Sequence, residues 1–144
     1  MPETRTLKRA RKARRQGKSP SSQAGEFVRE EIHHVREGKH GARSTRQAIA
    51  IGLSKARRAG VKLGVPKRAS ARTRQSARSA SARAGKKPSR TRSRASLGAL
   101  KHERRRAASP TALARQAKSS ARKRGPKARR AAARKAARTR RRRA

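Results

Sequence analysis

The sequence predicts a mainly α-helical fold, in which a short helical hairpin is flanked by largely disordered basic arms. Lys and Arg contribute 47 of the 144 residues against six acidic residues, so the net charge is +41. Four of those acids and most of the large apolar residues fall between residues 22 and 66. Outside that segment the chain has too little apolar surface to offset the entropy of ordering. We therefore predict a basic N-terminal arm at 1–21, a hairpin domain at 22–66 and a disordered basic tail at 67–144.

The first helix of the hairpin is predicted between Ser19 and Gly38. Its N-terminus is capped either by Ser19, which precedes Pro20, or by Ser22. Gly38 provides the left-handed residue at which helices commonly end. Apolar residues recur along this stretch at helical spacing, namely Ala24, Phe27, Val28, Ile32 and Val35.

The second helix is predicted from Ser44 to Gly60. Ser44 and Gln47 have the spacing of a capping box, and Gly60 is a second left-handed stop. One broad apolar face consists of Ala48, Ile49, Gly52, Leu53, Ala56 and Ala59. The short connection between the two helices favours an antiparallel hairpin. Two helices rarely bury enough surface to be stable alone. The sequence therefore leaves two possibilities open, a homodimer formed through the hairpin and docking of the hairpin onto a partner.

Enzymatic activity is not expected from this sequence. The chain has no Asp and no Cys, and its core is too small to hold reacting groups in place. Glu30, His33 or His34, and Glu37 share a helix face at a spacing that zinc could use. We interpret that face as solvated, and predict no metal, no cofactor and no small-molecule substrate. No apolar run is long enough to span a membrane, so no membrane partner is expected.

The expected partner is nucleic acid. The tail at 67–144 has thirty cations and one acid, and a DNA duplex presents about one negative charge per 1.7 Å of its axis. Tyr and Trp are absent and there is one Phe, which argues against recognition by base stacking. Binding should therefore involve the phosphate backbone, with little sequence preference. Lys39, His40 and Arg43 beside the start of the second helix could hold one phosphate.

The hypothesis is a non-enzymatic protein that binds DNA through its phosphate backbone. An RNA- or ribosome-binding protein is the alternative, and an adaptor whose hairpin docks a protein is a third. The cations expected to contact nucleic acid lie in the hairpin and the tail. They are Lys39, Arg43, Arg46, Lys55, Arg57, Arg58, Arg104, Arg105, Arg106, Arg122, Lys123, Arg124, Arg129, Arg130, Arg134, Lys135, Arg138, Arg140, Arg141, Arg142 and Arg143.

Two resemblances accompany this interpretation. Residues 23–66 resemble a small uncharacterised domain family of bacteria and phages, whose members share a Gly-Lys turn followed by a helix of the form QAIAI-LS-ARRAG. That resemblance implies a bacterial origin and a helical domain, and no particular reaction. The tail segment KARRAAARKAARTRRRRA is similar in composition to the tails of bacterial histone H1-like proteins, although it is richer in Arg and poorly keeps their Lys-Ala-Pro repeats. Taken with the charge, the two resemblances imply a histone-like protein, cytoplasmic and associated with the bacterial nucleoid.

Overall fold

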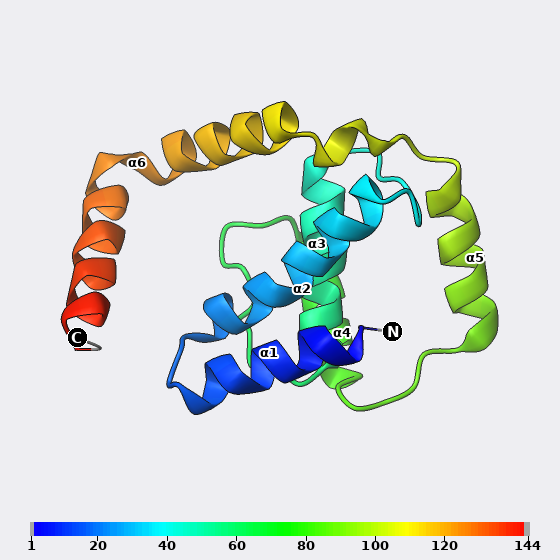
Figure 1. The fold of residues 1–144 in the computed structure, drawn as a ribbon, viewed down its shortest axis with the longest axis horizontal. Helices are drawn as coiled ribbons and strands as arrows, with labels where there is room; N and C mark the ends of the chain where they lie inside the picture. The colour runs from blue at the N-terminus through cyan, green and yellow to red at the C-terminus, as the bar shows by residue number, and fades with distance from the viewer. Residues whose placement is uncertain (1, 143–144) are drawn as a thin grey trace. The chain divides into compact units, whose positions relative to one another are not determined.

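A computed structural model of the chain describes residues 2–142 and is mainly helical, at 73%. Across residues 2–142 the chain forms six helices and one 3-10 turn, with no strand (Figure 1). They are α1 (Thr4–Arg15), α2 (Pro20–Arg36), α3 (Thr45–Arg58), α4 (Ala71–Ala82), α5 (Arg90–Lys101), η1 (Arg105–Ala108) and α6 (Pro110–Arg141).

The chain divides into two units, Met1–Ser109 and Pro110–Ala144. The first unit contains the predicted hairpin together with α1, α4, α5 and η1. The division therefore falls after Ser109, and not at residues 21 and 66 where the charge pattern placed it. The hairpin is the centre of a larger helical unit.

The two predicted hairpin helices are present with the predicted caps. Ser19 Oγ accepts a hydrogen bond from Ser22 N at 3.4 Å, and Ser44 Oγ accepts one from Gln47 N at 3.2 Å. In a capping box the Gln47 side chain would also accept from the backbone N–H of Ser44. Here Gln47 Oε1 instead accepts from Arg43 N, one residue earlier, at 2.6 Å. The helix starts are thus fixed by side chains that lie within the local sequence.

The two helices end at the predicted glycines. Gly38 has φ 77°, and Lys39 N donates to His34 O at 3.0 Å across the turn. Gly60 has φ 87° and ends α3 in the same way. This bond pattern is the Schellman motif, and it needs a residue without a Cβ in the left-handed region. The turn after Gly38 directs the following loop back across the end of α2.

Helices α2 and α3 cross closely at Gly52. A Cβ at this position would lie 2.7 Å from Val28 Cα and 2.9 Å from Val28 N, which is closer than packed atoms approach. Gly52 was expected on the apolar face of α3, and the structure shows why it is a glycine. The backbone of α2 fills the space that a side chain would need.

We expect Gly52→Ala to lower the free energy of unfolding by about 1–3 kcal/mol, because overpacking pushes the two helices apart. The matched control is Gly25→Ala on the exposed side of α2, where a Cβ would meet nothing within 4 Å. There the better helix propensity of Ala should stabilise the protein by up to about 1 kcal/mol. Urea unfolding followed by circular dichroism measures both. Equal effects at the two glycines would contradict the close crossing.

The predicted disorder of the N-terminal arm is wrong. Residues 4–15 form α1, which packs on α2 and buries Thr6, Ala10 and Ala13. Small side chains suffice here because they let two helices approach closely, so a core forms without long apolar residues. Ala10 joins Ala24, Phe27 and Ala56 in one buried cluster, and Leu7, Leu53, Val61 and Leu63 pack around it. This cluster joins α1 to both helices of the hairpin.

The start of the tail is also ordered. Helix α4 packs on α3 through Ala77 and Ala80, which are 6% and 5% exposed. Its N-terminus is capped by Ser70, whose Oγ accepts from Thr73 N at 3.2 Å. The turn after α4 returns to α3, where Gly85 N donates to Arg58 O at 3.0 Å. Helix α5 has no buried residue.

A second part of the tail, residues 100–108, packs against the loop between α2 and α3; we call it the docking segment. Backbone bonds join the two, from Gly41 N to Leu100 O at 2.8 Å and from Ala42 N to Arg104 O at 3.1 Å. A Cβ at Gly41 would collide with the carbonyl of Glu103, so only glycine fits. The η1 part is held by side chains of the hairpin, Arg36 to Ala108 O at 2.9 Å and Thr45 to Ala107 O at 2.6 Å.

The second unit is helical instead of disordered, which corrects the prediction for this part of the tail as well. Gly125, with φ 76° and ψ 168°, divides α6 into two straight pieces at 110–124 and 126–141. Neither piece has a buried residue. Alanine and arginine have high intrinsic helix propensities, which accounts for helix here without a core.

Candidate nucleic-acid interface

Five of the six glutamates pair with cations inside the first unit. Glu31 Oε2 lies 2.6 Å from Lys55 Nζ, and Glu30 Oε1 lies 3.5 Å from the same ammonium group. Near the N-terminus, Lys39 Nζ lies 3.1 Å from Glu3 Oε1 and 3.2 Å from Glu37 Oε2. The fifth, Glu26, pairs with Arg9 at 3.9 Å. Across residues 2–142, these five acids therefore pair with Arg9, Lys39 and Lys55 and with no cation of the tail.

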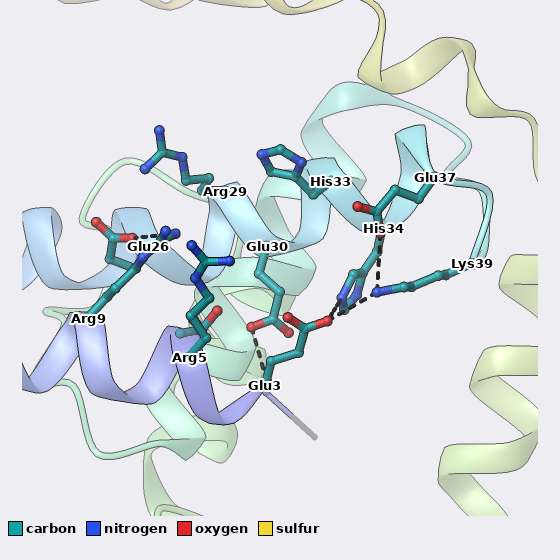
Figure 2. A pocket seen from close by; sticks show the side chains of 11 residues that line it. Glu3, Arg5, Arg9, Glu26, Arg29, Glu30, His33, His34, Glu37 and Lys39 are labelled. Carbon is teal, nitrogen blue, oxygen red and sulfur yellow. Dashed lines mark hydrogen bonds and ion pairs between the residues drawn. The ribbon is translucent and has the colours of Figure 1, made fainter.

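The pairs of Glu3 and Glu37 with Lys39 and of Glu26 with Arg9, together with Glu30, line a cleft of about 400 Å³. Figure 2 shows this cleft from close by. Helix α1 contributes Arg9 to one wall, and α2 contributes Glu26 and Glu30 to the other. At the end of the cleft, Glu3 points at the ring of His34, whose Nε2 lies 2.8 Å from Glu3 Oε1. Acidic and basic side chains thus alternate along the cleft, and it is not a uniformly basic surface for a polyanion.

The hydrogen-bond partners of Glu3 shift its pKa. Its pKa is lowered from 4.5 to about 2, first because His34 forms a hydrogen bond to the carboxylate and second because Lys39 does. The pKa of Lys39 is raised, first by its hydrogen bond to Glu3 and then by that to Glu37. Each partner favours the charged form of the other.

This lowered pKa predicts a pH dependence of stability. A carboxylate whose pKa is lower in the folded than in the unfolded state stabilises the fold fully above its unfolded pKa, and that contribution disappears as the pH falls through the folded pKa. We expect the melting temperature of wild type to exceed that of Glu3→Gln above pH 4.5, and the gap to close as pH falls to about 2. An NMR titration of Glu3 with a midpoint near 4.5 would contradict this account.

Several cations that the sequence assigned to nucleic acid are occupied within the hairpin. Lys39 and Lys55 pair with glutamates, as described above. Arg57 is 8% exposed and donates from Nη2 to Gly64 O at 3.1 Å. These three side chains therefore have partners within the first unit. The remaining hairpin cations Arg43, Arg46 and Arg58 are exposed.

The phosphate site expected beside the start of α3 is not assembled. Lys39 is directed at Glu3 and Glu37, and His40 is buried with Nε2 3.2 Å from Glu31 Oε1. The residues next to each other in sequence therefore do not converge on one anion. The polar spacing alone could not reveal this, because the acidic partners come from other parts of the chain.

The predicted tail cations lie at the surface in the described part of the chain. Arg104, Arg105 and Arg106 are exposed on the docking segment. The remaining ones are exposed on α6 and just beyond it: Arg122, Lys123, Arg124, Arg129, Arg130, Arg134, Lys135, Arg138, Arg140, Arg141 and Arg142. Arg143 lies outside the described residues.

One face of the last helical piece is continuous in charge. Arg134, Lys135, Arg138 and Arg142 line a shallow groove along it together with Ala131 and Thr139. The i, i+4 spacing of Arg134, Arg138 and Arg142 brings these three cations onto one side of the helix. Three other cations are exposed on α6 and are not among those predicted from the sequence to contact nucleic acid, namely Arg115, Lys118 and Lys127. Their only signal in the sequence is charge.

Comparison of the chain with family models, with curated proteins and with solved structures finds no match. In the described residues, no helix combines the length and apolar character needed to cross a membrane.

Proposed function

We propose that this chain is a non-enzymatic, histone-like protein that binds DNA through the phosphate backbone, with little sequence preference, in the bacterial nucleoid. One observation carries the proposal: the tail's cations within the described residues are exposed with a single acid among them, while the other five acids pair within the folded unit. Such a surface attracts a polyanion and repels other copies of itself.

The last helical piece supports duplex DNA as the polyanion. Residues 126–141 span about 24 Å at 1.5 Å per residue, and a duplex presents about 14 phosphate charges over that length. Eight cations lie on this piece. A helix is about 10–12 Å across and fits the DNA major groove, which is about 12 Å wide. The deep, narrow major groove of an RNA duplex does not admit side chains in this way. This geometry favours DNA over the RNA alternative.

The lack of surface aromatics supports contact with the backbone. The single Phe of the chain, Phe27, is fully buried, and the sequence has no Tyr or Trp. Base stacking of the kind used by proteins that bind single strands therefore has no Phe, Tyr or Trp available. Arginine is the commoner cation, and its planar guanidinium donates two parallel hydrogen bonds to one phosphate.

Ultraviolet crosslinking in cells, followed by sequencing of the attached nucleic acid, tests the proposal. The expected result is DNA fragments spread over the chromosome without a shared motif. Predominant recovery of ribosomal or messenger RNA would contradict it and would support the RNA-binding alternative. Truncation after Ser109, at the unit boundary, is the matched control, because the first unit keeps its core and loses the tail cations of α6.

A further inference from the structure

Two histidines and one glutamate meet at the end of α2, beneath the loop that follows it. Glu31 and His34 are one helical turn apart on α2, and His40 approaches from the loop. One donor atom from each lies within 4.8 Å of the other two. Glu31 is fully buried, and neither of its carboxylate oxygens has a hydrogen-bond partner that meets geometric criteria.

The hydrogen bonds of His40 leave a lone pair facing the carboxylate. Its Nδ1 lies 2.9 Å from Gly41 O, and because a carbonyl oxygen only accepts, Nδ1 carries the proton and donates. In the neutral ring Nε2 is then an acceptor, yet it lies 3.2 Å from Glu31 Oε1, which is also an acceptor. Two acceptors in a buried site repel each other unless a cation lies between them. A proton or a metal ion can fill that role.

The same geometry matches zinc coordination. Two ligands of a tetrahedral zinc ion with bonds of about 2.0–2.1 Å are about 3.3 Å apart, close to the separation of His40 Nε2 and Glu31 Oε1. The Nδ1–Gly41 contact orients His40 as outer hydrogen bonds orient zinc-bound imidazoles. His34 has an equivalent support, because its Nε2 lies 2.8 Å from Glu3 Oε1. When Nε2 donates to Glu3, Nδ1 of the neutral ring is left as a metal donor.

The charge of the surrounding network also fits a divalent cation. The ion pairs and hydrogen bonds around the site connect four carboxylates, from Glu3, Glu30, Glu31 and Glu37, with two ammonium groups, from Lys39 and Lys55. With neutral histidines this network has a net charge of −2. Lys55 contacts Glu31 Oε2 and leaves Oε1 toward the histidines.

We propose that Glu31, His34 and His40 form a Zn²⁺ site in which water completes a tetrahedron. The ion links the last turns of α2 to the loop that holds the docking segment, since Gly41 N donates to Leu100 O. Zinc binding therefore stabilises the attachment of residues 100–108 to the hairpin. This site is independent of the proposed nucleic-acid contacts, none of which uses these three residues.

Calorimetric titration of the full chain with ZnCl₂, after removal of metal with a chelator, tests the site. We expect one ion per chain, a higher melting temperature with zinc, and a Co²⁺ complex with the absorption of tetrahedral coordination. His34→Gln should weaken binding by at least about 100-fold. The matched control is His33→Gln, because His33 is the adjacent, exposed histidine on α2; its affinity should equal that of wild type.

A second readout does not depend on affinity. Zinc should slow tryptic cleavage after Arg104, Arg105 and Arg106 in wild type and in His33→Gln, but not in His34→Gln. The proposal is overturned if wild type binds no zinc, if both histidine variants lose affinity equally, or if zinc leaves cleavage unchanged.

Discussion

Replacement of Arg130, Arg134, Arg138 and Arg142 by Gln is expected to weaken binding to duplex DNA about 1,000-fold at about 0.15 M salt. The slope of log K against log salt is negative, and each lost phosphate contact makes it shallower by about 0.9. The loss of four contacts accounts for the 1,000-fold weaker binding. The four side chains are exposed at i, i+4 spacing on the last helical piece and just beyond it. Glutamine preserves helix propensity, so the change is one of charge. Fluorescence anisotropy with a labelled duplex measures it.

The matched control removes the same charge from the folded unit, through Arg5, Lys8, Lys12 and Arg15 on α1. These cations are also exposed, but they belong to a helix that packs on α2. We expect a much smaller loss of affinity than in the α6 variant. Equal losses would mean that binding depends on net charge alone and not on the tail.

Substitution of Lys55 by Met should have the largest effect on stability, a loss of about 3–5 kcal/mol. The Lys55 ammonium is the cation beside two carboxylates whose side chains are 2% and 0% exposed, Glu30 and Glu31. Without the ammonium group, both carboxylates remain buried with no lysine charge beside them. A buried charge without a compensating partner destabilises the folded state. Methionine keeps the length and the apolar stem of lysine. Chemical unfolding with a chelator present measures the loss, so that no metal ion replaces the ammonium group.

The control for this variant is Arg58→Met, which removes one cation from the exposed side of the last turn of α3. Its expected cost is at most about 1 kcal/mol, from the lost interaction with the helix dipole. Adding Glu31→Gln to Lys55→Met should recover part of the lost stability, because one of the buried charges is then absent. Equal costs at positions 55 and 58 would show that the buried pair does not hold the hairpin together.

The hairpin could be predicted from the sequence because its signals are local. Ser19 and Ser44 bond to backbone groups three residues away, and Gly38 and Gly60 adopt the left-handed turns that their positions indicate. The sequence does not predict helices α1 and α4 because their buried residues are small, for example Ala10 and Ala77. Alanine in a basic segment gives no pattern of large apolar residues that would indicate a core.

The docking segment could not be predicted, because its partner is far away in sequence. Backbone bonds from Gly41 and Ala42 hold it, and backbone groups leave no pattern in the side chains. The same limit applies to the candidate interface. Lys55 follows the pattern of a cation in a last helical turn, whereas in the fold it faces Glu31 on the neighbouring helix. Which cations are exposed thus depends on tertiary pairing of the few acids.

The salt dependence of duplex DNA binding by the full chain tests the central claim most directly. Anisotropy titrations at salt concentrations from about 50 to about 200 mM should show a loss of affinity of at least about 1,000-fold, as for a protein that makes six or more phosphate contacts. Duplexes of unrelated sequence should give the same curve. A change of less than about tenfold over that range, or a curve that depends strongly on sequence, would contradict binding through the phosphate backbone.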